Sequence, residues 1–483
     1  MSDNPFINEP YAPAPESTPV GIRDSYGHFI DNQFIDSEDG ATRETINPSS
    51  GKVLSRIAEG SVADVDKAVR AARRAYDKTW SKLIPAERGK YLYRLARLIQ
   101  EHSRELAVLE SMDGGKPIRE SRDIDIPLVA AYFFYYAGWA DKLAYAFPNR
   151  RVSPHGVAGQ IIPWNFPLLM AAWKIAPAVA CGNTVVLKPA EYTPLTALKL
   201  AELVAEADFP PGVVNFVTGG SAAGKALVEH PDVDKVAFTG STVVGKSIQS
   251  SLAGTGKPYT LELGGKAAHI VFEDAAIDQA VEGVVNGIFF NQGHVCCAGS
   301  RLLVQEGIAQ DFYRKLEHRM KTLVLGDPLD KNTDIGAINN APQLEKIGTY
   351  LDEAREEGLE VVDGGQSVPE QGYWCAPTFV KDAPQSSRIV REEVFGPVLT
   401  VQTFRTPDEA IEKANNTRYG LSGGVWTDKG SKIFSATSNI QAGVLWANTF
   451  NKFDPTAPFG GFKESGLGRE GGMHGLDSYV KLS

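Results

Sequence analysis

Apolar side chains recur at helical spacing in the first third of the chain. They lie three to four residues apart at Val65, Val69, Ala72 and Tyr76. Ser61, followed three residues later by Asp64, forms a capping-box signature that predicts a helix start. A second helix is predicted through 92–99, where leucine and isoleucine recur at the same spacing, and Gly114-Gly115 with Pro117 is expected to end the helical region.

Beyond Gly156 the pattern changes to short β-branched runs that alternate with helical stretches. The runs 184–187, 213–217 and 235–238 predict strands, and 195–207 predicts a helix. Repeated βαβ units require a parallel sheet covered on both faces. A second alternating block begins near Ala268 and continues to about Leu445, so we expect two α/β units in series.

Length and composition fit a globular enzyme of several structural units. The chain has 483 residues, of which 43% are hydrophobic and 22% charged. No run of eighteen apolar residues occurs, because the longest apolar stretch, 128–140, stops at Asp141. We therefore expect no membrane-spanning helix. The net charge of −10 disfavours binding to nucleic acid or to an anionic membrane surface.

The N-terminus and the cysteines indicate a reducing compartment. Residues 1–20 contain five prolines among acidic and small residues and lack the basic and apolar regions of a signal peptide, so a loose cytoplasmic tail is expected. Four cysteines cannot form a disulfide framework in a chain of this length. No cluster has the spacing of a zinc site, and we predict no structural metal.

One motif favours a different class of enzyme. Residues 240–247 satisfy the pattern GxxxxGK[ST] of nucleoside triphosphatases, and 270–274 resembles the strand that ends in a magnesium-binding carboxylate. A loop that wraps phosphate needs positive φ angles, which β-branched Val243 and Val244 resist. A tight strand-to-helix junction suits them better, with Gly240 admitting a pyrophosphate at the helix N-terminus. A dinucleotide is therefore favoured, and the triphosphatase is kept as an alternative.

Seven short motifs occur in order along the chain. They are PWNFP at 163–167, LKPAE at 187–191, FTGS at 238–241, LELGGK at 261–266, the cysteine loop FNQGHVCCAGS at 290–300, EEVFGP at 392–397 and PFGG at 458–461. Together they resemble the motifs of the aldehyde dehydrogenase superfamily over about 31–483. A single cysteine is more often a small core residue, but this set of motifs places Cys296 in a loop that exposes it to substrate.

The resemblance implies a covalent mechanism. Cys296 matches the nucleophile, whose addition to an aldehyde creates an alkoxide that can surrender hydride. Asn165 matches the amide that stabilises this oxyanion together with the backbone N–H of Cys296. Glu262 matches the base that activates water to hydrolyse the thioester, and its apolar neighbours would raise its pKa. Lys174 and Glu470 match a pair that relays protons away from the base.

The resemblance also implies the cofactor site. Lys188 and Glu191 match the pair that binds the adenosine ribose, and a carboxylate there repels a 2′-phosphate, so NAD is expected rather than NADP. The other residues expected to bind the cofactor are Gly240, Ser241, Gly245, Glu393 and Phe395.

An aromatic tunnel is implied for the substrate. By resemblance it is lined by Phe166, Met170, Trp173, Phe290 and Phe453, which suits unbranched or aromatic aldehydes. Asn451, Lys452 and Asp454 add polarity near its mouth, so hydroxylated and charged aldehydes stay open. A third reading, a non-catalytic scaffold, would need none of Cys296, Glu262 and Asn165.

The fold implied by the resemblance is α/β, with a Rossmann-like cofactor domain, an α/β catalytic domain and a shortened oligomerisation arm. The boundaries we expect are a tail at 1–20, an NAD-binding domain at 21–142 and 156–262, a reduced oligomerisation element at 143–155 and 476–483, and a catalytic domain at 263–475.

Two features depart from the family pattern. His294 replaces the usual Gln or Glu two residues before the nucleophile, which adds a group that can titrate near neutral pH. The arm at 143–155 is short and carries Pro148 and Pro154. Because tetramers of the family pair through a longer arm, we expect a homodimer. The alternative is that the short arm leaves room for a different partner.

Overall fold

The computed structural model describes residues 16–483. Most of the predicted tail, 1–20, therefore lies outside the described residues. Within its remaining part, Glu16 is buried, its carboxylate pairs with Arg104 at 2.7 Å, and its backbone N–H donates to the carbonyl of Leu329. The end of the predicted tail is thus attached to the body of the protein.

An eight-stranded sheet, which we call the first sheet, is built around five parallel strands. Its order is β21-β11-β10-β7-β8-β9-β2-β3, and β2, β3 and β21 are antiparallel to their neighbours. The strands are β2 (His28–Ile30), β3 (Gln33–Ile35), β7 (Val157–Ile161), β8 (Thr184–Lys188), β9 (Val214–Phe216), β10 (Lys235–Thr239), β11 (Tyr259–Glu262) and β21 (Gly466–Leu467). Its central strands are buried on both faces, as continuous β-branched runs require.

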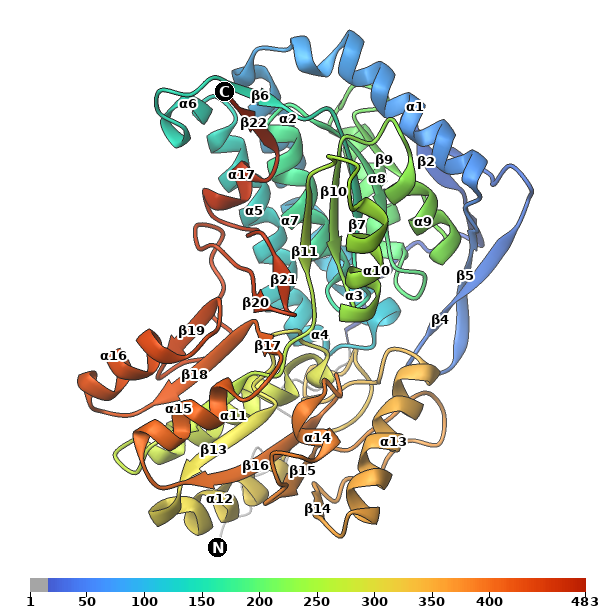
Figure 1. The fold of residues 1–483 in the computed structure, drawn as a ribbon. Coiled ribbons are helices and arrows are strands. Elements are labelled where there is room, and N and C mark those ends of the chain that lie inside the picture. The colour runs from blue at the N-terminus through green and yellow to red at the C-terminus, as the bar shows by residue number, and fades with distance from the viewer. Residues whose placement is uncertain (1–15) are drawn as a thin grey trace, which may run out of the picture.

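Helices cover both faces of the first sheet (Figure 1). On one face α1 (Val62–Lys78), α9 (Ser221–Glu229) and α10 (Thr242–Leu252) share one hydrophobic cluster with the strands. The other face packs against α7 (Pro167–Ala180) and α8 (Leu195–Glu206), with α2 (Pro85–Glu101), α3 (Ser103–Gly114) and α5 (Ile126–Trp139) beyond them. Between α3 and α5 lie α4 (Ile118–Glu120) and one π-helical turn (Ser121–Asp125).

The second sheet has seven strands, parallel except for its edge strand β14. Its order is β14-β15-β16-β13-β12-β18-β19. The strands are β12 (Ala268–Val271), β13 (Arg301–Gln305), β14 (Glu360–Asp363), β15 (Thr378–Lys381), β16 (Val398–Phe404), β18 (Ser422–Trp426) and β19 (Val444–Ala447). The helices of this part are α11 (Ile277–Phe289), α12 (Ala309–Lys321), α13 (Ala341–Glu356), α14 (Arg388–Arg391), α15 (Pro407–Asn415) and α16 (Gly430–Asn439).

Smaller elements complete the described chain. β1 (Ser25–Tyr26), β5 (Lys52–Ala58) and β4 (Thr42–Asn47) form a three-stranded sheet, and β17 (Tyr419–Gly420) pairs with β20 (Phe462–Lys463). Single 3-10 turns occur at Trp80–Lys82, Phe290–Gly293 and Glu306–Ile308. The two large, mostly parallel sheets and the helices that accompany them confirm the predicted α/β class.

The chain returns to the first sheet after β19. β21 pairs antiparallel with β11, with Leu261 opposite Leu467 and Glu262 opposite Gly466. The predicted boundaries assign 466–467 to the catalytic domain, whereas the structure places these residues on the edge of the first sheet. The physical reason is that the edge of β11 needs partners for its backbone groups.

The shortened arm pairs with the C-terminal strand of its own chain. β6 (Val152–Pro154) and β22 (Val480–Leu482) form a two-stranded antiparallel sheet, and Arg151 and Ser483 exchange backbone hydrogen bonds beyond it. Between α5 and β6 lies the single turn α6 (Leu143–Ala146), and α17 (His474–Asp477) precedes β22. The arm therefore offers only three residues of pairing.

The local signals in the sequence are confirmed where they were strongest. Ser61 caps α1 with a reciprocal capping box to Asp64. α3 ends at Gly115, whose φ of 82° is the left-handed conformation that glycine adopts without strain. The predicted strands at 184–187 and 235–238 are β8 and β10, each one residue longer, and the strand predicted at 213–217 is the shorter β9.

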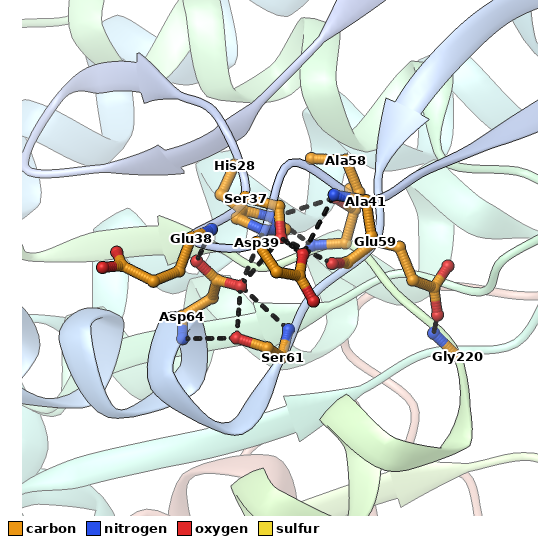
Figure 2. A network of polar contacts seen from close by, with 11 residues as sticks. His28, Ser37, Glu38, Asp39, Ala41, Ala58, Glu59, Ser61, Asp64 and Gly220 are labelled. Carbon is orange, nitrogen blue, oxygen red and sulfur yellow. Dashed lines mark hydrogen bonds and ion pairs between the residues drawn. The ribbon is translucent and has the colours of Figure 1, made fainter.

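Asp64 also ties the start of α1 to the loop that follows β3 (Figure 2). Its Oδ2 accepts from the backbone N–H of Ser61 at 2.8 Å and from the hydroxyl of Ser37 at 3.1 Å, and its Oδ1 accepts from the N–H of Glu38 at 3.0 Å. Burial raises the pKa of Asp64, but these hydrogen bonds outweigh it and hold the pKa below its usual value. The carboxylate is thus a structural anion.

We expect Asp64→Ala to lower the free energy of unfolding by about 2 kcal/mol, because an N-cap partner and several charge-assisted hydrogen bonds are lost together. Urea titration followed by circular dichroism measures the change. The control is Asp66→Ala in the same helix, whose ion pairs with Arg70 and His230 are partly exposed and contribute little. Equal effects of the two variants would contradict the role given to Asp64.

Candidate active site

A single cavity of about 860 Å³ holds most of the predicted site residues. Its lining includes residues at the carboxyl ends of β7, β8, β10 and β11 and residues from the loop that follows α11. The carboxyl ends of parallel strands are where open α/β sheets bind ligands. The cavity therefore brings the ligand edge of the first sheet together with the cysteine loop.

A strained turn places the cysteine. Asn291, Gln292 and Gly293 all have positive φ, at 48°, 52° and 74°. They follow α11 and direct the chain toward Cys296, which is partly exposed and lines the cavity. Cys297 lines the same cavity but is buried, beside Asn451. A hydrogen bond with Cys297, together with burial, raises the pKa of the Cys296 thiol well above its usual value. The thiol at rest is therefore protonated.

Asn165 lies opposite this loop, between β7 and α7. Its Nδ2 donates to the carbonyl of His294 at 2.8 Å, and its backbone carbonyl accepts from Nδ2 of Asn291 at 2.7 Å. A carboxamide nitrogen carries two protons, so one N–H is left for a ligand oxygen. Asn165 and Cys296 both line the cavity.

Glu262 is the last residue of β11 and also lines the cavity. It is buried, and neither of its carboxylate oxygens has a hydrogen-bond partner among the described residues. Burial, followed by the negative charge of Glu470, raises its pKa well above the usual value. Gly460 keeps the space free, because a Cβ there would lie 2.8 Å from Oε1 of Glu262. An unpartnered buried carboxyl of this kind can act as a base.

Lys174 and Glu470 form the expected pair. Lys174 extends from α7, is fully buried and is hydrogen bonded to Glu470. The charges of both residues act on Glu262, in opposite directions. The pair therefore lies within electrostatic range of the carboxyl, as a proton relay requires.

Lys188 and Glu191 stand at the end of β8. The Lys188 ammonium donates to the carbonyls of Pro189 and Gly219, both at 2.8 Å, and lies 3.9 Å from Glu191. Burial lowers the pKa of Lys188 to about 8. The Glu191 side chain is about one third exposed, at 34%, and lines the cavity. Lys188 is thus fixed by the protein, while Glu191 is open to a ligand.

Ser241 and Gly240 mark the junction of β10 and α10. The Ser241 hydroxyl caps α10 by accepting from the N–H of Val244 at 3.3 Å, and both residues line the cavity. Gly245, also expected to bind cofactor, lies outside the cavity lining. It faces Leu263, where a Cβ would come within 2.4 Å of that side chain. The glycine is required there for close helix packing.

Glu393 and Phe395 are the remaining residues that the sequence predicted to bind the cofactor, and both line the cavity. Glu393 Oε1 accepts from the backbone N–H of Gly265 at 2.9 Å, and burial raises its pKa. Phe395 lies edge-on to Trp164 at 5.2 Å. Gly265 has no room for a side chain, because a Cβ would lie 2.2 Å from the carbonyl oxygen of Cys296. The close approach of the Cys296 backbone thus explains why the second glycine of the LELGGK motif is needed.

The expectation for His294 is wrong. Its ring is buried against Trp164 and Phe395, with centroid distances of 4.8 and 5.8 Å. Burial lowers its pKa to about 3, so the imidazole is neutral at physiological pH. Its backbone, rather than its ring, supports the loop, since its carbonyl accepts from Asn165.

All five expected tunnel residues line the cavity. Phe166 stacks on Phe290 at 6.1 Å, and Trp173 lies edge-on to Phe453 at 6.5 Å. The sequence reasoning missed further apolar lining residues, namely Ile124, Leu128, Leu169, Val295 and Phe459. Phe459 stands in the PFGG motif, which was a usable signal, whereas Ile124 and Leu128 had only helical spacing.

The triphosphatase alternative does not fit the geometry. Neither Gly240 nor Gly245 has positive φ, and Ser241 is extended at φ −68° and ψ 146°, so no loop wraps a phosphate. Lys246 is on the surface, paired with Glu464 at 2.9 Å. Asp274, at the position of the magnesium ligand, pairs with Lys432.

Residues 16–483 also lack two other features. No group of three His, Cys, Asp or Glu side chains there is arranged to hold a metal ion. No helix in that part of the chain is long and apolar enough to cross a membrane.

Known proteins match this chain over nearly its whole length. The family model described as "Aldehyde dehydrogenase family" matches residues 34–483. The human protein named "Aldehyde dehydrogenase, mitochondrial" is 45% identical over 482 residues, covering 97% of this chain and 93% of its own. Arabidopsis thaliana "Aldehyde dehydrogenase family 2 member B4, mitochondrial" is 46% identical over 465 residues, covering 94% and 86%.

Solved structures match nearly the whole chain. The NAD+ complex of aldehyde dehydrogenase from Bacillus cereus has a TM-score of 0.93 at 42% identity and covers 96% of each chain. The NAD-dependent aldehyde dehydrogenase from Sinorhizobium meliloti has a TM-score of 0.92 at 40% identity and covers 96% of this chain and 94% of its own.

Proposed function

Because this chain belongs to the aldehyde dehydrogenase family and is an NAD-dependent enzyme of it, we propose that it oxidises aldehydes to carboxylic acids through a thioester on Cys296. The observation that carries the proposal is one cavity that contains a partly exposed thiol, an amide with a free N–H and a buried carboxyl without a partner. A scaffold would need none of these groups.

In the first half-reaction the Cys296 thiol gives its proton to solvent water in the cavity, and Sγ adds to the aldehyde carbon. The carbonyl oxygen becomes an alkoxide, which accepts hydrogen bonds from the free N–H of Asn165 and the backbone N–H of Cys296. As the alkoxide collapses to a carbonyl, the C–H bond breaks with its electron pair and a thioester is left. NAD, when bound, supplies the acceptor for that hydride.

In the second half-reaction Glu262 takes a proton from water, and the water oxygen adds to the thioester carbon. The C–S bond breaks, the acid leaves and Cys296 is regenerated. The proton passes from Glu262 toward the buried pair of Lys174 and Glu470, whose charges both act on it. The absence of a hydrogen-bond partner leaves Glu262 free to bind water.

The residues present fit NAD. Glu191 is open to the cavity and can accept from both ribose hydroxyls, beside the fixed ammonium of Lys188. Ser241 stands at the N-terminus of α10, whose free N–H groups and dipole favour a pyrophosphate. Glu393 and Phe395 line the same cavity near Cys296 and would hold the nicotinamide ribose and ring. The aromatic tunnel suits unbranched or aromatic aldehydes.

We expect Cys296→Ala to abolish turnover and Glu262→Gln to release one burst of NADH and then stall as the thioester. Stopped-flow absorbance with a short aldehyde and NAD measures both, with ATP hydrolysis assayed in parallel. Burial raises the pKa of Glu262, and a base acts only when ionised, so deacylation should rise with pH above the range of an ordinary carboxyl. Steady turnover in Cys296→Ala would move the assignment to Cys297.

We expect the wild type to prefer NAD over NADP, and Glu191→Gln to weaken NAD binding about tenfold or more while admitting NADP. The loss of a charge-assisted hydrogen bond of about 1.5–3 kcal/mol gives this magnitude. Steady-state KM values for both cofactors measure it. The control is Glu229→Gln, a carboxylate that lines the same cavity in α9 and should leave the cofactor ratio unchanged. Equal use of both cofactors by the wild type would refute the role of Glu191.

We expect a homodimer. β6 and β22 pair with each other over three residues within one chain, so the arm presents only a short edge for a contact between dimers. Light scattering coupled to size exclusion at micromolar concentration measures the mass. A stable tetramer would show that the length of the arm does not control assembly.

A further inference from the structure

A cluster of buried charged side chains lies next to the cysteine loop, and the proposed reaction does not use it. We call Glu110, Lys116, Glu120 and Asp125 the Lys116 cluster; each is at most 5% exposed. The Lys116 ammonium lies 2.5 Å from Oδ2 of Asp125 and 3.3 Å from Oε1 of Glu110. Glu120 ends α4, and the π-helical turn that follows carries Asp125 into the cavity lining.

Burying such a cluster costs desolvation free energy. One ammonium faces three carboxyl groups, and Oε2 of Glu110 and Oδ1 of Asp125 have no hydrogen-bond partner among the described residues. Burial, followed by the charge of Asp125, raises the pKa of Glu120 to about 8. Apolar residues of the same size would be at least as stable in such a place. A function for the cluster would account for this cost.

Glu120 contacts the strained turn directly. Its Oε2 accepts from the backbone N–H of Asn291 at 2.9 Å. Asn291 and Gln292 both hold left-handed backbone angles, which are strained for a residue other than glycine. Without Glu120 the N–H of Asn291 would be buried without a partner, and the turn would lose the bond that offsets its strain.

The side chain of Asn291 continues the connection to the oxyanion amide. Its Nδ2 donates to the carbonyl of Asn165 at 2.7 Å, and Nδ2 of Asn165 donates to the carbonyl of His294 at 2.8 Å. From the other side, the Lys116 ammonium lies 4.2 Å from the ring centre of Phe166, the residue after Asn165. The Lys116 cluster therefore touches both segments that define where the Asn165 amide points.

We propose that Glu120 is a positioning residue for the oxyanion amide of Asn165 and acts through Asn291; the proposal rests on the function proposed above. A donor moved by a fraction of an ångström stabilises the alkoxide less, so the effect should fall on thioester formation. Binding of NAD should not change, because the ribose residues Lys188 and Glu191 are not part of this chain of contacts.

The test uses variants built on Glu262→Gln, in which the thioester accumulates and each site gives one burst of NADH. The burst amplitude counts folded sites, and its rate constant reports their chemistry. We expect Glu120→Ala to lower the rate constant roughly tenfold to a hundredfold, at unchanged Kd for NAD measured by fluorescence quenching. Glu120→Gln keeps an oxygen acceptor for Asn291 and should retain most of the rate.

Two further variants separate positioning from folding. Glu110→Gln removes a carboxylate from the same cluster without a contact to the loop, and should leave the rate constant unchanged. Asn291→Gly keeps the left-handed backbone but deletes the side chain, and should slow the burst even if Glu120→Ala fails to fold. Combined with Glu120→Ala, it should slow the burst by less than the product of the two single effects.

The outcomes distinguish the two proposals. If Glu120→Ala and Asn291→Gly give the reference rate constant per folded site, or if Glu110→Gln slows the burst as much as they do, the positioning role is overturned while the proposed function stands. If the Glu262→Gln reference gives no burst, or if Asn165→Ala leaves its rate constant unchanged, the proposed function or the oxyanion role of Asn165 has failed.

Discussion

The left-handed turn at 291–293 determines where Cys296 can stand. Such a turn is unstable alone, and its partners all come from distant parts of the chain. Glu120 accepts a hydrogen bond from the backbone N–H of Asn291, and the side chain of Gln292 donates to the carbonyl of Ala337. Only a glycine fits at position 293, because a Cβ there would lie 2.0 Å from the carbonyl oxygen of Gly396. Because each contact joins segments far apart in the sequence, the conformation of the turn depends on the tertiary fold. The strain is thus located at the functional site and compensated around it.

Burial of charge is the second constraint on the site. Glu262 has no hydrogen-bond partner among residues 16–483 and lies near the charges of Lys174 and Glu470, an arrangement that costs stability and gives a carboxyl with a raised pKa. Water-excluded surroundings also strengthen the hydrogen bonds that Asn165 can give to an alkoxide. Burial shifts the pKa of His294 in the opposite direction, downward, and so keeps its imidazole neutral.

Sequence patterns predicted the parts that depend on local physics. Strand runs such as 184–187 are buried on both faces, which their continuous apolar composition indicates, and the capping box of Ser61 and Asp64 lies within four consecutive residues. The titration of His294 was mispredicted because its ring environment comes from Trp164 and Phe395, far away in the sequence. The sequence also did not predict the pairing of β21 with β11 or the Lys116 cluster. Both join residues that are far apart in the sequence, and neither produces a periodic pattern.

The match at 240–247 shows why a motif must be tested by backbone geometry. The residue types satisfy a phosphate loop, yet Ser241 is extended, Gly245 is needed for packing against Leu263 and Lys246 pairs with a surface carboxylate. What the segment offers instead is the N-terminus of α10 at the ligand edge of the first sheet. A helix N-terminus binds a pyrophosphate without enclosing it, so the rest of a dinucleotide can extend along the cavity toward Cys296. Under the proposed function, the open backbone of this segment lets the same residues hold a pyrophosphate instead of enclosing a triphosphate.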